Sequence, residues 1–155
     1  MTELIRKQGL LIDEEKRSWE DAVRICGGLM LSLGSVTKEY IDAMVAAVHD
    51  LGPFIVIAPH IAFAHAAAGA HVLKNDLVLV VFREPIIFGS DNDPVHLMFG
   101  LSALEPGSHL ELLQRLAVVL EGGKISEKLM NAATVEALYG LINTGYLPSF
   151  TFDFK

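Results

Sequence analysis

Three histidines lie within fourteen residues, APHIAFAHAAAGAH (58–71), that are otherwise almost wholly alanine, glycine and apolar groups. They are His60, His65 and His71. Burying an imidazole without a partner costs free energy, so a place in a core strand does not by itself account for them. The chemistry open to imidazole is metal binding, acid–base catalysis or nucleophilic attack.

The spacing of the three histidines falls loosely within that of histidine metal ligands, but the rest of the segment supports a metal site poorly. The segment contains no carboxylate or thiolate, and a proline and a glycine interrupt any helical register. Cys26 is the single cysteine, so a cysteine-based zinc site and an internal disulfide are both excluded. We therefore expect no bound metal, with a histidine metal-binding module as a lesser alternative. A serine hydrolase is weaker still, since the chain has no G-x-S-x-G motif.

The surroundings of His65 favour a nucleophilic role. Alanines and a glycine follow it, so a partner's phosphorylated group could approach the ring closely. A neutral imidazole nitrogen can attack phosphorus without a separate base. Phosphoryl transfer through a loose, in-line transition state then needs mainly position and hydrogen-bond donors.

The elements that would hold these histidines alternate between helical and strand patterns. Capping residues and apolar stripes predict helices at 18–34, 37–52, 108–123, 126–132 and 134–142, and apolar runs predict strands at 54–58, 76–82 and 96–104. Ser108 is expected as an N-cap, with Glu111 completing a capping box. Between the last two strands we expect a short strand and a polar loop, and the tail 145–155 is expected to dock as a sheet edge. The order predicts a single domain, 1–155: an α/β three-layer sandwich whose mixed central sheet is flanked by helices.

Charge and hydropathy narrow the class of partner. Twelve Lys and Arg stand against nineteen Asp and Glu, a net charge of −7, and no basic run is present to neutralise phosphates. We therefore expect no nucleic-acid partner. The N-terminus is too charged for a signal peptide, and the apolar run 53–70 is broken by two prolines and the histidines. These features predict a cytoplasmic protein that binds another protein or a small molecule.

Three motifs together resemble a known family. GPFIVIAPHIAFAHA is similar to the phosphoacceptor segment of enzyme IIA proteins of the sugar phosphotransferase system (PTS), of the mannitol/fructose type and most like its ascorbate branch. NDPVHLMFGLSA and SHLELLQRLA resemble two further family segments, in the same order. The matching positions of the first motif are Gly52, Pro53, Val56, Pro59, Ile61, Ala62, His65 and Ala66. Three positions depart: His60 replaces a glycine, Ala64 a proline, and Ala67 an often polar or basic residue.

The resemblance implies specific roles and partners. His65 would carry the phosphoryl group, and His109 would orient it. The phosphoryl group would come from the histidine-containing phosphocarrier protein and pass to a cysteine of enzyme IIB, indirectly serving a membrane enzyme IIC. No cofactor is implied, and the transported sugar would be ascorbate or a related compound.

Other residues near the motifs are further candidates. His60, His49 and Ser108 would support the site from outside. For His49, near the end of a predicted helix, a favourable charge–dipole interaction is the simpler explanation. A non-catalytic IIA-like regulator that senses phosphorylation is the alternative function. The oligomeric state is left open, a homo-oligomer included.

Overall fold

The computed structural model describes residues 3–121 and 123–144, and these form a five-stranded mixed sheet with helices on both faces. The elements are the 3-10 helix η1 (Lys7–Gly9), β1 (Leu10–Asp13), α1 (Trp19–Ser32), α2 (Lys38–Leu51), β2 (Val56–Ala58), β3 (Ile61–Ala64), β4 (Asp76–Ile86), β5 (Val95–Ser102), α3 (Leu110–Leu120), α4 (Lys124–Met130) and α5 (Val135–Thr144). The strand order is β1-β4-β5-β3-β2. Strand β1 is parallel to β4 and β3 is parallel to β5, whereas β4–β5 and β2–β3 are antiparallel. The predicted α/β sandwich with a mixed sheet is confirmed.

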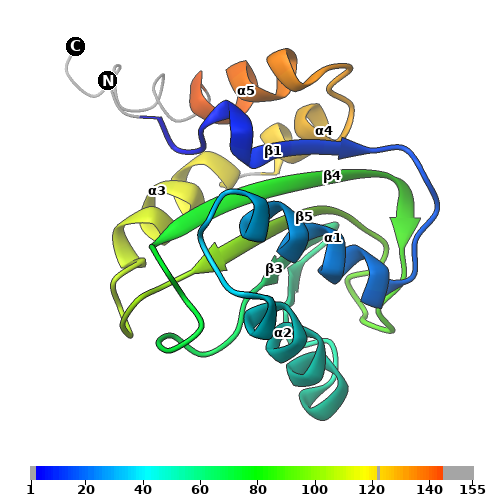
Figure 1. Ribbon diagram of the computed structural model, residues 1–155. Coiled ribbons are helices and arrows are strands. Elements are labelled where there is room, and N and C mark those ends of the chain that lie inside the picture. The colour runs from blue at the N-terminus through cyan, green and yellow to red at the C-terminus, as the bar shows by residue number, and fades with distance from the viewer. Residues whose placement is uncertain (1–2, 122, 145–155) are drawn as a thin grey trace.

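Each face of the sheet has its own apolar core. Along β4, Val78, Val80 and Phe82 pack with α1 and α2, and the alternate residues Leu77, Leu79 and Val81 pack with α3, α4 and α5 (Figure 1). This alternation follows from the two-residue repeat of a strand, and a strand buried on both faces reads as one continuous apolar run. Within the described residues, no helix combines the length and apolar character needed to cross a membrane.

The first two helices begin where the sequence predicts. Ser18 is the N-cap of α1, and its hydroxyl accepts a hydrogen bond from the Asp21 N–H at 3.1 Å. Thr37 occupies the N-cap position of α2, although its side chain does not cap the helix. Cys26 is buried on the inner face of α1, and this burial raises the pKa of its thiol to about 12.

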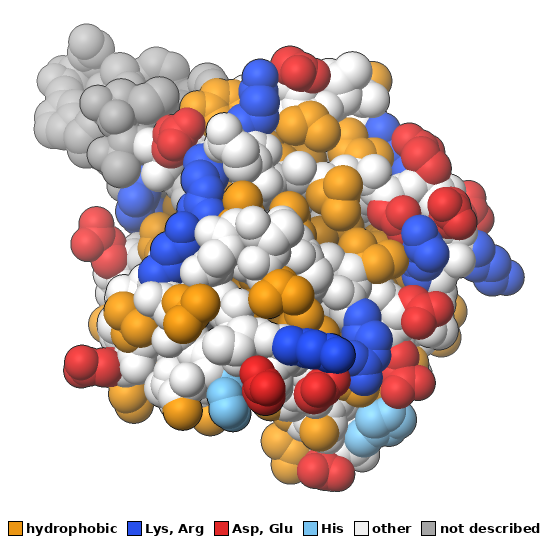
Figure 2. Space-filling view, viewed as in Figure 1, with side chains coloured by type: hydrophobic (Ala, Val, Ile, Leu, Met, Phe, Trp, Pro, Cys, Tyr) orange, Lys and Arg blue, Asp and Glu red, His pale blue; other side chains and the backbone are white. Residues whose placement is uncertain are grey.

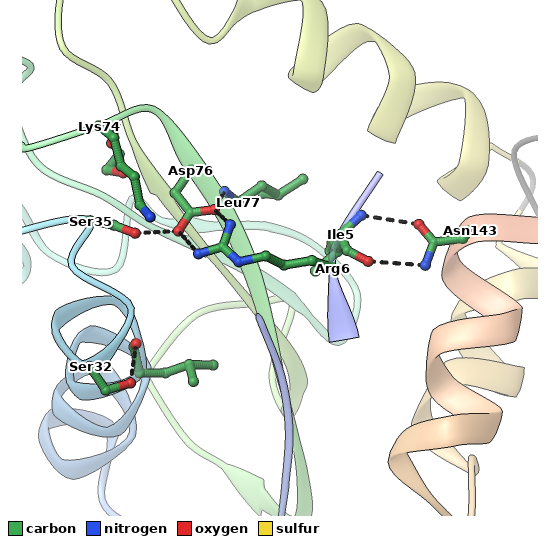
Figure 3. A network of polar contacts seen from close by, with 10 residues as sticks. Ile5, Arg6, Ser32, Ser35, Lys74, Asp76, Leu77 and Asn143 are labelled. Atoms are coloured by element: carbon green, nitrogen blue, oxygen red, sulfur yellow. Dashed lines mark hydrogen bonds and ion pairs between the residues drawn. The ribbon is translucent and has the colours of Figure 1, made fainter. Parts of the chain in front are cut away.

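A buried polar network fixes the start of β4 (Figure 3). Asp76 is only 5% exposed, and both of its carboxylate oxygens accept hydrogen bonds from the Arg6 guanidinium, at 2.8 and 3.0 Å. Ser35, from the turn between α1 and α2, also donates to Asp76. On the other side of the N-terminal segment, the Asn143 side-chain amide accepts from Ile5 N–H and donates to Ile5 C=O. The network therefore joins the first residues, the α1–α2 turn, β4 and α5.

Several predicted strands need correction. β1 and β3 were not expected, and the strand predicted at 54–58 is the shorter β2. The separate short strand expected after residue 82 is the end of β4, which continues past an irregular register to Ile86. β1 and β3 have four residues each and gain their hydrogen bonds from long neighbouring strands, a tertiary effect that local patterns do not reveal. The tail 145–155, for which a sheet edge was predicted, lies outside the described residues.

Candidate active site

His65 follows directly after β3, at the end of the sheet where the parallel strands β3 and β5 both finish. His109 lies in the segment between β5 and α3, which begins at the same end of the sheet. The loops after the two strands meet, because the Gly69 N–H donates to the Ala103 carbonyl at 3.4 Å. The topology therefore places the expected phosphoacceptor, His65, and the expected phosphate-orienting residue, His109, at the same end of the sheet.

The His65 ring is half-buried and its orientation is fixed by its own strand. Nδ1 lies 2.8 Å from the carbonyl oxygen of Phe63. A carbonyl only accepts, so Nδ1 carries the proton and Nε2 keeps an unshared electron pair. Phe54 packs edge-on against the ring, with centroids 5.5 Å apart. Nε2 is thus the nitrogen that this arrangement prepares for nucleophilic attack.

Tyr40, from the first turns of α2, holds the backbone next to His65. Its hydroxyl accepts a hydrogen bond from the Ala66 N–H at 3.0 Å and donates to the Leu101 carbonyl at 2.7 Å. The side chain is 1% exposed, and burial raises the pKa of its phenol, so the hydroxyl keeps its proton at neutral pH. Nothing in the sequence pattern gives Tyr40 this positioning role. A polar tip within an apolar helical stripe is the signal that could have found it.

The predicted capping box at Ser108 is wrong. The N-cap of α3 is His109, and its side chain makes no cap hydrogen bond. Ser108 Oγ instead lies 2.9 Å from Asn75 Oδ1 and 2.8 Å from the Glu105 carbonyl. Asn75 also accepts from the Leu104 N–H at 2.8 Å. Ser108 therefore folds the loop that carries His109, and Asn75 ties this loop to the start of β4; no sequence signal identifies Asn75.

His109 is half-buried, and its Nδ1 atom is fully enclosed with no hydrogen-bond partner among the described residues. A proton on Nδ1 would leave a buried donor unpaired, which native structures rarely tolerate. The favoured tautomer therefore carries its proton on Nε2. In that tautomer His109 can donate a hydrogen bond to an anion at this end of the sheet.

His60 is not brought to His65. It lies at the opposite end of β3, a strand of four residues that spans about 13 Å. Its Nδ1 lies 3.0 Å from the Pro94 carbonyl, and its ring faces that of His96, with centroids 6.0 Å apart. Its φ is +72°, a left-handed conformation that favours glycine. This backbone geometry explains why the similar family motif has glycine there.

His49 also has another partner. It lies in the last turn of α2, and its Nε2 is 2.8 Å from the Glu20 carboxylate on α1. Its ring packs edge-on against Trp19, with centroids 4.9 Å apart. The structure therefore shows His49 joining two helices. Its position in the last turn of α2 is the one from which we predicted a favourable charge–dipole interaction.

A shallow hollow of about 430 Å³ adjoins the segment after His65. It is lined by Ala43, Ala46, Ala47, Asp50, Leu51, Ala66 and Ala67, so within the described part of the chain no Lys or Arg lines it. Leu51 and Phe54, close by in sequence, are both exposed. Figure 2 shows Lys and Arg as well as Asp and Glu side chains spread over the face bearing α1. The hollow beside the segment after His65 is therefore lined mainly by small apolar side chains rather than by basic ones.

The described residues contain no group of three or more His, Cys, Asp and Glu side chains placed to hold a metal ion. The first histidine segment illustrates the reason. His60 and His65 are at opposite ends of β3, and His71 is an exposed loop residue. The nitrogen atoms of the three rings therefore do not converge.

Comparisons with known proteins find similar chains. An ascorbate-specific PTS system EIIA component from Mycoplasma pneumoniae is 27% identical over 133 residues, which cover 85% of this chain and 84% of that protein. A mannitol-specific cryptic phosphotransferase enzyme IIA component from Escherichia coli K12 is 24% identical over 145 residues, covering 94% and 99%.

A solved structure shares the fold. It is the complex of the mannitol enzyme IIA with phosphorylated enzyme IIB from Escherichia coli, with a TM-score of 0.77 and 23% identity over 89% of this chain and 96% of that one. Residues 3–145 match the family described as phosphoenolpyruvate-dependent sugar phosphotransferase system, EIIA 2. The chain therefore belongs to the EIIA 2 family of the sugar phosphotransferase system.

Proposed function

We propose that, within the phosphocarrier role of this family, Nε2 of His65 accepts a phosphoryl group from the histidine-containing phosphocarrier protein and passes it to a cysteine of enzyme IIB. The observation that carries the proposal is the hydrogen bond from His65 Nδ1 to the Phe63 carbonyl. It leaves Nε2 as the one ring nitrogen with a free electron pair.

The first transfer follows from that geometry. The electron pair of His65 Nε2 attacks phosphorus, an N–P bond forms, and the bond from phosphorus to the donor's histidine breaks. The His65 ring then carries a substituent on each nitrogen and becomes positively charged. The bond from Nδ1–H to Phe63 strengthens as this charge develops, since a charge-assisted hydrogen bond is about twice as strong as a neutral one.

The second transfer restores the starting ring. The sulfur of an enzyme IIB thiolate attacks phosphorus, the bond to Nε2 breaks, and the electron pair returns to His65. Nδ1 keeps its proton throughout, because the Phe63 carbonyl accepts a hydrogen bond but does not take up the proton itself. A solved complex with phosphorylated IIB in the mannitol system supports IIB as the class of acceptor.

His109 is the proposed donor to the phosphoryl oxygens. Its Nε2–H tautomer follows from the enclosed, unpaired Nδ1, and the loop holding it is tied down through Ser108 and Asn75. A hydrogen bond to a charged group contributes roughly 1.5–3 kcal/mol, so His109→Ala should slow transfer by about 10- to 100-fold while His65 remains the acceptor. An unchanged rate in both half-reactions would place His109 outside the site.

Ascorbate or a related sugar is the proposed substrate of the complete system, supported by the sequence likeness to ascorbate-specific EIIA components. The discriminating measurement is transfer from the phosphorylated chain to purified IIB proteins of the ascorbate, mannitol and fructose types. We expect the fastest transfer to the ascorbate-type IIB. Faster transfer to either of the others would reassign the sugar class.

Reconstitution tests the central claim. The chain is incubated with phosphoenolpyruvate, enzyme I and the phosphocarrier protein, and acid-labile phosphate is mapped by mass spectrometry and assigned to a ring nitrogen by NMR. We expect label on Nε2 of His65, none in His65→Ala, and full labelling of the exposed-loop control His71→Ala. Label on another residue overturns the proposal. Label on His65 that no IIB accepts identifies a phosphorylation sensor instead.

A further inference from the structure

A pair of histidines with no assigned role lies at the end of the sheet opposite to His65. His60 directly precedes β3, and His96 is the second residue of β5. The two strands are parallel, and Ile61 pairs with Leu97, so the residues that precede them also lie opposite one another. The His60 carbonyl accepts hydrogen bonds from the N–H groups of His96 and Leu97, at 3.0 and 2.9 Å. The two imidazole rings are neighbours as a result, with centroids 6.0 Å apart and planes inclined by 46°.

The same ring nitrogen is anchored in both histidines. His60 Nδ1 lies 3.0 Å from the carbonyl oxygen of Pro94, and His96 Nδ1 lies 2.8 Å from that of Phe82. A carbonyl only accepts, so each Nδ1 carries the proton and each Nε2 keeps its electron pair. Histidines that bind metals are commonly held in this way, because the N–H of the other ring nitrogen donates to a backbone carbonyl or a carboxylate.

Both Nε2 atoms are available to a ligand. Neither has a hydrogen-bond partner among the described residues, and neither belongs to the enclosed polar atoms that lack a partner. Each Nε2 therefore reaches solvent, although both histidines are half-buried. Two neighbouring nitrogens that only accept cannot bond to one another, whereas a cation can bind both.

The backbone of His60 is a further indication that its side chain has a use. Its φ of +72° lies in the left-handed region, and among the described residues it is the one residue other than glycine with a positive φ. An L-residue in this region is strained, whereas glycine is not. Strained residues persist where the surrounding structure holds them, and they are concentrated at functional sites.

The ions that suit two imidazoles are divalent late transition metals. Imidazole nitrogen binds Zn²⁺, Cu²⁺ and Ni²⁺, whereas Mg²⁺ and Ca²⁺ require oxygen ligands. With Zn–N bonds of about 2 Å, two imidazole centroids lie about 5 Å apart around a tetrahedral ion, so the two rings need to approach by about 1 Å. Within the described residues, no third His, Cys, Asp or Glu side chain joins this pair, so water would complete the coordination.

We infer that His60 and His96 together bind one divalent late transition-metal ion through their Nε2 atoms. The site is separate from His65 and does not depend on the proposed phosphotransfer. The probe is Zn²⁺ alone, added to the full chain; calorimetry measures its binding, and NMR follows the imidazole resonances of His60 and His96.

We expect saturable binding of Zn²⁺ that shifts the resonances of both rings, and no binding of Mg²⁺. His60→Gly, which suits the positive φ, and His96→Gln should each weaken Zn²⁺ binding by at least about tenfold. The double variant should bind little more weakly than either single variant, because each single change already removes the shared ion. His71→Ala, which removes an exposed loop histidine, should leave binding unchanged.

Three results would overturn the inference. The first is the absence of saturable Zn²⁺ binding to the wild-type chain. The second is weakening by only one of the two variants, which would show that a single ring binds the ion. The third is binding that survives both variants but is lost in His65→Ala, which would place the ion at the candidate phosphoacceptor.

Discussion

Replacing Tyr40 by phenylalanine removes one oxygen atom and two hydrogen bonds beside the candidate phosphoacceptor. The Ala66 N–H and the Leu101 carbonyl both lose their partner, and Tyr40 is too deeply buried for water to replace the hydroxyl easily. A hydrogen bond contributes about 1 kcal/mol net, and a buried group left unpaired costs more, so we expect a loss of roughly 2–3 kcal/mol in unfolding free energy. The backbone after His65 is also freed, and we expect labelling of His65 to slow by about tenfold.

Urea unfolding and quench-flow labelling of the same preparation measure the two effects. Tyr139→Phe is the matched control, because the Tyr139 hydroxyl binds the exposed Glu3 carboxylate at the surface. It should alter neither stability nor labelling appreciably. If Tyr40→Phe slowed labelling no more than Tyr139→Phe, the reasoning about backbone position would be refuted even with the stability loss observed.

Three further perturbations test the fold around the site. Asp76→Asn should lower the unfolding free energy, measured by urea unfolding, by about 3 kcal/mol, because it leaves Arg6 without its buried partner. The control Asp42→Asn, which breaks an exposed pair with Arg24, should lower it by less than about 0.5 kcal/mol. At His60, whose φ is +72°, valine should be less stable than glycine by about 2 kcal/mol in the same assay, and neither variant should change His65 labelling by more than about twofold. Burial raises the pKa of Cys26 to about 12, so the folded chain holds this proton more tightly than the unfolded chain. The resulting stabilisation is complete below pH of about 8.5 and falls by about 1.4 kcal/mol per pH unit above it, a slope that Cys26→Ala should lack in unfolding measured from pH 8 to 11.

The sequence was most informative where a local pattern reports on local structure. The capping serine and the apolar stripe predicted α1, and the apolar run within 76–82 predicted a buried strand. The four-residue strand β3 was missed because alanine has little preference for strands, and the hydrogen bonds that define it come from β5.

The same distinction applies to the candidate site. His65 and His109 were predicted from motifs, but the contacts that hold the residues next to them, Ala66 and Ser108, come from residues distant in sequence. Tyr40 reaches Ala66 across 26 positions, and Asn75 reaches Ser108 across 33. His60 is the opposite case, because it lies close to His65 in the motif but at the other end of β3 in the structure. An extended strand separates side chains that a sequence window brings together.

The strand order of the described sheet also bears on strand-to-strand aggregation. The two longest strands, β4 with eleven residues and β5 with eight, are inner strands, and the edges are the short strands β1 and β2. Proline residues flank β2, and its pairing with β3 is irregular, so it offers a poor template for a strand from a second molecule. Within the apolar run Leu77–Phe82, the segment best suited to cross-β stacking, Leu79–Val81 are paired on both sides, with β1 and β5. Within the described sheet, β4 can pair with a strand of another molecule only when β1 or β5 detaches, so the stability of the edge strand β1 contributes to resistance against strand-to-strand aggregation.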